Sequence, residues 1–208
     1  LLCLSLKTGI SLLTIPNTDK KCQLKYYFPL MFHKDTKNTP QRAPIKRVIR
    51  SLIESDVPEV MSIQCACYGS QFMEPASVYQ RRLQSKGHCS LAATVNDELV
   101  AYLAAYWSQP GVVTPLHGDF QCYEQPTVLY LHDMAVAPHM AGYGLARSLL
   151  LTIKHMARER AIGLSALVSV QDSREYWQRH GYQIHTITDA QQAQNLASYG
   201  ADAVYMVG

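Results

Sequence analysis

A glycine-containing loop between a strand and a helix is the part of this sequence best suited to chemistry. Residues 128–136 read Val-Leu-Tyr-Leu-His-Asp-Met-Ala-Val, a mostly apolar stretch typical of a strand. Pro138 ends it, Gly142 and Gly144 follow in a tight turn, and an amphipathic helix pattern starts there. The first turn of a helix has backbone N–H groups without partners, and the helix dipole favours negative charge there. The loop therefore predicts a site for a phosphorylated ligand.

Two common phosphate-binding motifs fit this loop poorly. A P-loop requires Lys and then Ser or Thr after its last glycine, but Leu145 follows Gly144. A dinucleotide-binding fingerprint requires a third glycine where the chain has Arg147, and an acidic residue about twenty positions later. Neither motif is supported.

His132 and Asp133 form an unusual polar pair within the apolar stretch. Neighbouring side chains of a regular strand point to opposite faces, so only one would face a cleft unless a β-bulge alters the alternation. A buried charge requires a partner. Two interpretations remain open. The pair is either a catalytic base with an orienting group or substrate anchor, or a hydrogen-bonded pair that fixes neighbouring loops.

Other classes of site find little support. The remaining histidines lack the spacing of metal ligands, and no Gly-x-Ser-x-Gly motif occurs, so we predict no metal. The six cysteines contain no Cys-x-x-Cys pair, which favours reduced thiols in a cytoplasmic protein. No run of about 18 apolar residues occurs, so we predict no membrane span.

The 208 residues divide by composition into an extension and a domain. The first 50 residues carry ten Lys or Arg and two Asp or Glu, whereas residues 51–208 carry nine and fourteen. Residues 1–45 show no sustained hydrophobic period, so we expect a basic, mostly disordered extension before a domain at 46–208. Because its lysines are scattered, we expect no binding to nucleic acid or membrane.

Hydrophobic periodicity predicts alternating strands and helices from residue 45 onward. The unit around the glycine loop is a parallel crossover within an otherwise antiparallel sheet. The proline-containing segment 108–127 is expected to be a functional lid or disordered. The expected strands are 45–49, 89–95, 99–107, 128–136, 164–170, 182–186 and 203–207, and the expected helices are 55–68, 75–86, 144–160, 173–180 and 189–197.

Three spaced motifs together resemble the GNAT superfamily of acetyl-CoA-dependent N-acyltransferases, in particular a microbial and fungal branch. Residues 139–146, His-Met-Ala-Gly-Tyr-Gly-Leu-Ala, resemble its Gln/Arg-x-x-Gly-x-Gly/Ala signature. The preceding strand end, Met-Ala-Val-x-Pro at 134–138, is also typical. Residues 176–182, Tyr-Trp-Gln-Arg-His-Gly-Tyr, resemble its aromatic-aromatic-x-x-x-Gly-aromatic helix end. The order of elements from 45 to 208 matches as well.

The resemblance implies a mixed α/β fold with a mostly antiparallel sheet of about six or seven strands, one parallel crossover and helices on both faces. It implies transfer of an acetyl group from acetyl-CoA, as co-substrate, to a primary amine of a small molecule or peptide by direct attack. An alkyl ammonium with a pKa near ~10.4 must first lose a proton. We expect His132 and Asp133 to be catalytic, in a monomer or homodimer. The alternative is an acyl-CoA-binding sensor or partner module with little turnover.

The resemblance also assigns residues to the cofactor. Strand backbone groups are expected to pair with the pantetheine arm, and N–H groups of the loop to hold the pyrophosphate. His139 departs from the family's Gln or Arg, so a long cation is missing. Trp177 replaces a Tyr that protonates the departing thiolate, and it is expected to pack against the cofactor arm instead. The expected cofactor-binding residues are Met134, Ala135, Val136, His139, Met140, Ala141, Gly142, Tyr143, Gly144, Leu145, Ala146 and Trp177.

Overall fold

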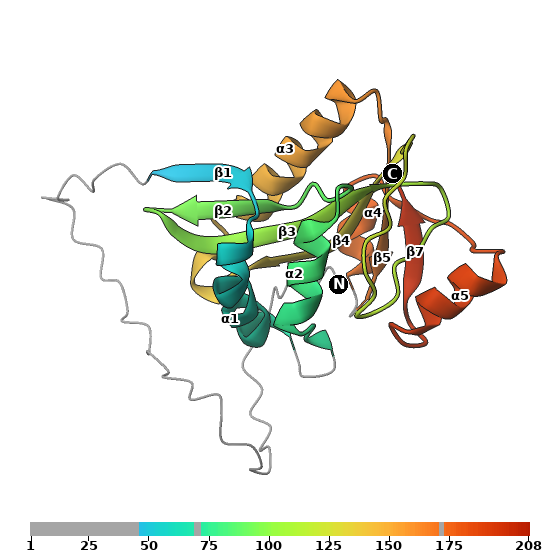
Figure 1. Ribbon diagram of the computed structural model, residues 1–208, viewed down its shortest axis with the longest axis horizontal. Helices are drawn as coiled ribbons and strands as arrows, with labels where there is room; N and C mark the ends of the chain where they lie inside the picture. Colours follow the sequence, from blue (N-terminus) through green and yellow to red (C-terminus); the bar gives the residue numbers. More distant parts are fainter. Residues whose placement is uncertain (1–45, 69–71, 171–172) are drawn as a thin grey trace, which may run out of the picture. The chain divides into compact units, whose positions relative to one another are not determined.

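The computed structural model describes residues 46–208 apart from 69–71 and 171–172, and the expected extension 1–45 lies outside the described residues. Within the described ranges, seven strands form one sheet in the order β1-β2-β3-β4-β5-β7-β6 (Figure 1). Every neighbouring pair is antiparallel except β4 and β5, which are parallel, as the sequence predicts. The strands are β1 (Arg47–Ser51), β2 (Leu91–Val95), β3 (Glu98–Ser108), β4 (Val128–Val136), β5 (Leu164–Ser169), β6 (Gln183–Ile184) and β7 (Val204–Val207).

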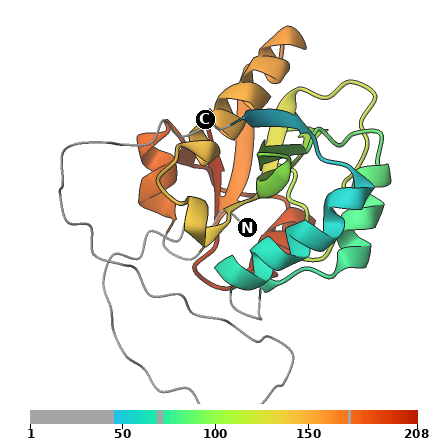
Figure 2. The same cartoon turned by 90° about the vertical axis from the view of Figure 1, so that its left-hand side faces the viewer.

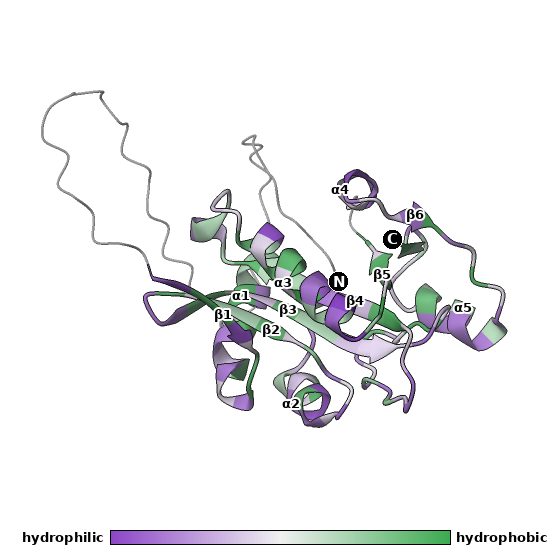
Figure 3. Cartoon of the chain, turned by 90° about the horizontal axis from the view of Figure 1, so that it is seen from above, coloured by the Kyte–Doolittle hydropathy of each residue, from purple (hydrophilic) through white to green (hydrophobic). Residues whose placement is uncertain are grey.

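Helices cover both faces of this sheet, which confirms the expected mixed α/β fold. The first two α-helices lie on one face and the next two on the other (Figures 2 and 3). None of the described helices is long and apolar enough to cross a membrane. The α-helices are α1 (Val57–Cys67), α2 (Ala76–Gln84), α3 (Leu145–Glu159), α4 (Arg174–Arg179) and α5 (Ala190–Ala197), and short 3-10 turns are η1 (Glu54–Asp56) and η3 (Pro138–Met140).

The two faces of the sheet bury different kinds of side chain. The α3 face is largely aliphatic, with Leu145, Leu149 and Ile153 of α3 almost fully buried. These positions follow the 3.6-residue period that predicts an amphipathic helix. The α1–α2 face is instead rich in buried tyrosine: Tyr68, Tyr79, Tyr102, Tyr106, Tyr130, Tyr199 and Tyr205.

A β-bulge interrupts β4 at His132. Asp133 lies opposite Ala104 of β3 and Leu131 lies opposite Ala105, so His132 has no partner across the pair. One extra residue in a strand reverses the side-chain alternation from that point onward. The bulge therefore places the side chains of His132 and Asp133 on the same α1–α2 face.

The strands β4 and β5 part beyond the bulge. Their parallel pairing runs from Val128 with Leu164 to Leu131 with Leu167 and ends there. The rest of β4, up to Val136, therefore has an edge that β5 does not cover.

The long segment 108–127 is ordered, so the expectation of disorder is wrong. Hydrogen bonds hold it from two sides: Tyr199 Oη donates to Thr114 O at 2.6 Å, and Arg82 Nε donates to Gly118 O at 2.9 Å. Phe120 is buried in the core between these points. The segment is thus part of the packed domain, and its role as a functional lid stays a prediction.

Candidate functional site

The glycine loop presents unpaired backbone N–H groups beside open space. Gly142 and Gly144 have φ angles of 82° and 78°, in the left-handed region that glycine adopts most readily. A Cβ built on either residue would have no atom within 4 Å, and among the described residues neither N–H donates a hydrogen bond. Leu145 begins α3, whose first N–H groups have no partner inside the helix. This arrangement suits an anionic ligand.

The other predicted residues of the loop surround these N–H groups. His139, Ala141 and Tyr143 are exposed, Met140 and Ala146 are half-buried, and Leu145 packs into the core. The structure adds a residue that the sequence does not indicate, because it lies in a distant strand. Arg47 of β1 donates to Tyr143 O at 3.4 Å, and its guanidinium lies 6.0 Å from the Tyr143 ring. A long cation therefore reaches the loop, although position 139 lacks one.

The uncovered edge of β4 offers backbone groups next to the loop. Ala137 N donates to Val100 O of β3 at 2.8 Å, so the alternation of a strand directs the backbone of Met134 and Val136 away from β3. Ala135 lies between them, and its backbone groups are directed to β3 instead. Of the three predicted residues, Met134 and Val136 are thus placed to pair with an added chain.

The carbonyl groups of this edge already have donors from the end of α1. Tyr68 Oη donates to Met134 O at 3.1 Å, and Cys67 Sγ donates to Val136 O at 3.3 Å. The N–H groups of Met134 and Val136 point to the same edge. A ligand amide that lies along this edge would therefore find mainly hydrogen-bond donors.

The Asp133 carboxylate lies inside a cage of three phenols. Tyr68 Oη donates to Oδ1 at 2.6 Å, Tyr79 Oη donates to Oδ2 at 2.6 Å, and Tyr102 Oη also donates to Oδ2. Asp133 is 1% exposed, so these bonds replace the water that a carboxylate requires. Burial, and next the Asp133 charge, raise the pKa of all three tyrosines well above its usual value.

His132 belongs to a second buried network on the same face. Its Nε2 lies 3.2 Å from Glu74 Oε2, and Arg82 forms a two-pronged ion pair with the same carboxylate, with Nη2 at 2.7 Å from Oε1. Burial acts to raise the pKa of Glu74, but His132 and Arg82 outweigh it and hold that pKa well below its usual value. Glu74 also accepts a hydrogen bond from His117 N at 2.9 Å.

Burial, together with the Arg82 charge, lowers the pKa of His132 to about 3. The imidazole is therefore neutral at neutral pH and binds a proton weakly, which disfavours it as a general base. The sequence does not reveal Glu74 as its partner, because 58 residues separate them. Tyr79 and Arg82 have a helical spacing that places both on one face of α2. The sequence therefore indicates this part of the site, which lies on the second helix, but not its partners on other elements.

Trp177 lies within the core of the α3–α4 face. Its side chain is fully buried, with its ring 5.3 Å from that of Tyr182 and 4.9 Å from that of Tyr176. Its indole N–H has no hydrogen-bond partner among the described residues. The packing gives Trp177 a role in the core, and its contact with a cofactor arm stays a prediction.

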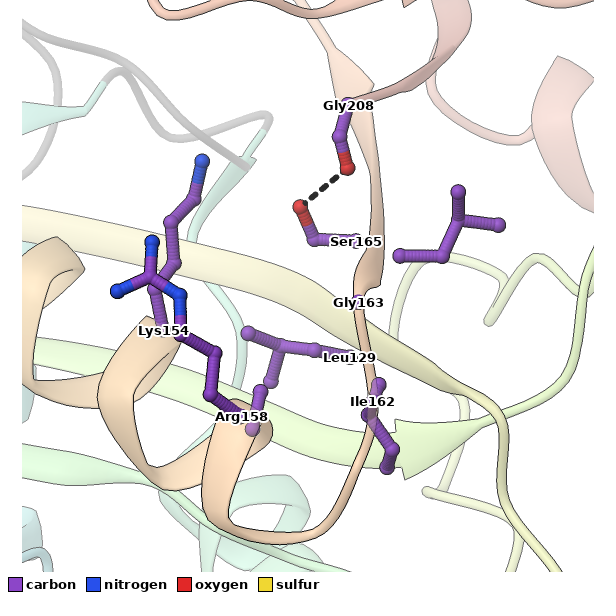
Figure 4. A pocket seen from close by; sticks show the side chains of 9 residues that line it. Leu129, Lys154, Arg158, Ile162, Gly163, Ser165 and Gly208 are labelled. Carbon is purple, nitrogen blue, oxygen red and sulfur yellow. Dashed lines mark hydrogen bonds between the residues drawn. The ribbon is translucent and has the colours of Figure 1, made fainter.

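A small cavity of about 130 Å³ lies at the other end of β4 and β5 (Figure 4). Lys154 and Arg158 of α3 line it together with Leu129 and Ser165, which lie near the start of each strand. It contains no predicted site residue. The described residues also hold no group of three His, Cys, Asp or Glu side chains that could bind a metal ion.

Comparisons with known proteins agree with the fold. The model of the acetyltransferase (GNAT) family matches residues 57–182. A search of curated protein sequences finds no match. The ribosomal-protein-S18-alanine N-acetyltransferase from Escherichia coli has a similar structure, with 16% identity and a TM-score of 0.57 over 78% of this chain and 92% of that one.

Two further solved structures share the fold. The PaiA N-acetyltransferase from Thermoplasma acidophilum, in complex with coenzyme A, is 12% identical, with a TM-score of 0.54 over 78% of this chain and 98% of that one. The GphF GNAT-like decarboxylase, in complex with isobutyryl-CoA, is 17% identical, with a TM-score of 0.60 over 77% of this chain and 97% of that one. Because the family model spans more than half of the sequence and includes the glycine loop, the chain belongs to the acetyltransferase (GNAT) family.

Proposed function

We propose that this protein transfers an acetyl group from acetyl-CoA to a primary amine of a small molecule or peptide by direct attack, without a covalent enzyme intermediate. The family supports acyl transfer in general. The observation that carries the proposal is the open glycine loop at the start of α3, next to the uncovered edge of β4. An extended, phosphorylated thioester that binds across both features would meet hydrogen-bond donors along its length.

Each part of this region has a role in binding. The N–H groups of Gly142, Gly144 and the first turn of α3 hold the pyrophosphate, and Arg47 adds a positive charge near the loop. Met134 and Val136 donate their N–H groups to the pantetheine arm. Acetyl-CoA would supply the acetyl group as a thioester. A backbone N–H where β4 and β5 part would stabilise negative charge on the thioester oxygen.

Asp133 is the better of the two predicted catalytic residues. It is an acceptor beside the uncovered edge of β4, because its partner Tyr68 also contacts Met134 O. His132 instead faces Glu74 and Arg82, with a pKa of about 3. We therefore assign proton uptake to Asp133 and a supporting role to His132. We expect a cytoplasmic monomer or homodimer.

A second candidate is an acyl-CoA-binding sensor or partner module with little turnover. The burial of both predicted catalytic side chains favours it, since His132 is 2% and Asp133 is 1% exposed. Trp177 also takes the place of a tyrosine that would protonate the thiolate. The two candidates share the cofactor site and differ only in whether an amine is acetylated.

Calorimetric titration of acetyl-CoA into the full chain tests the shared site. The Gly142→Asp/Gly144→Asp double variant adds two carboxylates where the phosphates would lie. Its matched control is Gly111→Asp/Gly200→Asp, because these glycines also have positive φ angles, of 73° and 100°, and open space around them. We expect saturable binding to the parent and the control, and loss of at least about 100-fold in affinity in the loop variant.

The outcomes separate the hypotheses. No binding to a folded parent, or equal loss in both double variants, would exclude the proposed cofactor site. Release of CoA with a panel of amines (a diamine, an amino acid, an aminoglycoside and a lysine peptide) would support the transferase. Tight binding without release of CoA for any amine would support the sensor.

A further inference from the structure

We propose that the Tyr68 hydroxyl is a catalytic residue that passes a proton from the acceptor amine to the buried Asp133 carboxylate. This inference rests on the proposed acetyl transfer. It explains how a carboxylate that is 1% exposed could act on a substrate that does not reach it.

The position of Tyr68 distinguishes it from the other two phenols of the cage. Its Oη donates to Asp133 Oδ1 at 2.6 Å and lies 3.1 Å from Met134 O, on the edge of β4 that β5 leaves uncovered. Tyr79 and Tyr102 bind the other carboxylate oxygen and each other, at 3.4 Å between hydroxyls. Of the three phenols in the cage, only Tyr68 therefore connects Asp133 with the edge where the thioester would lie.

The local backbone accounts for this placement. The α1 helix ends at Cys67, and Tyr68 has extended angles, with φ of −114° and ψ of 151°. Its N–H still donates to Gln64 O at 2.8 Å, which fixes the residue to the last turn of the helix. The ring thereby lies over β4 instead of continuing along the helix surface.

The surroundings of the Tyr68 hydroxyl favour transfer of a proton to Asp133 over ionisation of the phenol. Burial, then the charge of Asp133, raise the pKa of Tyr68 well above its usual value, so the phenol keeps a proton in the resting state. Among the described residues, the groups that face it are Asp133 and the Met134 carbonyl of β4, Tyr79 of α2, Tyr102 of β3 and Cys67 of α1. Asp133 is the only carboxylate among these described groups and accepts the shorter hydrogen bond of the phenol, at 2.6 Å against 3.1 Å for Met134 O, so it is the group to which the proton moves.

In the proposed step, one proton of the amine moves to Asp133 and a second moves to the thioester sulfur. A primary ammonium gives a proton to Tyr68 Oη while the phenolic proton moves to Asp133 Oδ1, which leaves a neutral amine and a protonated Asp133. The amine nitrogen then forms a bond to the acetyl carbon, and the bond from that carbon to sulfur breaks with its electron pair on sulfur. The second proton of the nitrogen goes to that sulfur, and after product release Asp133 releases its proton to solvent through Tyr68.

The test compares Tyr68→Phe with Tyr79→Phe in the full chain. Each variant removes one hydroxyl that donates to Asp133 at 2.6 Å, but only the first removes the connection to the β4 edge. With an amine that the parent acetylates, we expect Tyr68→Phe to lower kcat by about 100-fold. Tyr79→Phe should lower kcat by less than about fivefold, because the path remains.

Two further readouts separate catalysis from structure. Calorimetric Kd for acetyl-CoA and the urea midpoint should agree between the two variants within about twofold and ~0.3 M respectively, since each loses one similar buried bond. A kcat loss of similar size in both variants would overturn the proposal. A weaker Kd or lower midpoint specific to Tyr68→Phe, sufficient to explain its slower turnover, would overturn it as well.

Failure of the proposed function gives a different result. If the parent acetylates no amine of the panel, the transferase and the Tyr68 step both fall, whatever the variants do. If the parent acetylates an amine and the two variants are alike, only the role of Tyr68 falls.

Discussion

His132 and Asp133 are neighbours in β4, yet both side chains lie on the α1–α2 face, because His132 occupies a bulge that has no partner on β3. Each joins a different buried network, one built on the Glu74–Arg82 ion pair and one on three tyrosines. The bulge thus brings two polar centres together at the point where β4 and β5 part. A regular strand would have buried one of them in the aliphatic face around α3.

The lowered pKa of His132 predicts that acid destabilises the fold. The folded pKa is about 3, whereas an unfolded histidine titrates near ~6.5, so between these values the unfolded chain binds a proton that the folded chain does not. The free energy of unfolding should therefore fall as pH falls through this window, by up to about 1.4 kcal/mol per pH unit from this group.

Urea unfolding at pH 7 and pH 5 measures this loss. The His132→Gln variant should lose less stability between the two pH values than the parent. His155→Gln, at an exposed position on α3, should lose as much as the parent. If His132→Gln were as sensitive to this change as the parent, His132 would not be the cause.

The buried Glu74–Arg82 pair predicts a large cost when one partner is removed. Both side chains are 1% exposed, so Glu74→Gln leaves the guanidinium of Arg82 without its counter-charge. We expect a loss of about 3–5 kcal/mol in the free energy of unfolding. The Glu74→Gln/Arg82→Met double variant should lose less than the sum of the two single variants, because it leaves no unpaired charge.

A neighbouring ion pair provides the control for this prediction. Arg81 and Asp119 form an ion pair between α2 and the segment 108–127, but their side chains are 48% and 57% exposed. Asp119→Asn should cost less than about 1 kcal/mol in the same unfolding measurement. A comparable cost at both pairs would mean that burial does not determine the effect.

We predict that segment 108–127 becomes more sensitive to proteolysis when one of the hydrogen bonds that anchor it is removed. Tyr199→Phe removes the hydroxyl that donates to Thr114 O at 2.6 Å within the buried core. An unsatisfied buried carbonyl costs about 1–3 kcal/mol, and the freed end of the segment should open more often. Limited proteolysis at native conditions should then cut within 108–127 faster than in the parent. Equal cutting rates would show that this bond does not hold the segment.

Much of the fold could be predicted from hydrophobic periodicity, because its signals are local. The strand at 128–136 has the predicted bounds, and α3 begins within one residue of its predicted start. Deviations occur where tertiary contacts intervene. The first helix is expected to start at Ser55, but α1 starts at Val57, because Asp56 turns back to accept from Ile53 N and to pair with Arg50.

The candidate site also has one part that the sequence indicates and one part that depends on tertiary contacts. The glycine loop is contiguous in sequence, so its glycines and the helix start indicate it directly. The cage around Asp133 is not contiguous in sequence, because its tyrosines are 65, 54 and 31 residues from Asp133. No spacing rule links a residue just after one helix with residues on a second helix and a strand before the sheet order is known. The bulge too is a property of pairing with β3, so the sequence permits it without placing it.

The burial of Trp177 allows two roles to be distinguished, namely packing in the core and contact with the cofactor arm. If the ring only packs between α4 and the sheet, Trp177→Phe should cost about 1–3 kcal/mol in the free energy of unfolding, through the smaller volume it fills. Because the side chain is 0% exposed, the Kd for acetyl-CoA should stay within about twofold of the parent. Calorimetry and urea unfolding of the same sample measure both quantities. A Kd that rises tenfold or more in a variant that remains folded would instead show that Trp177 contacts the cofactor arm, as the resemblance to the family implies.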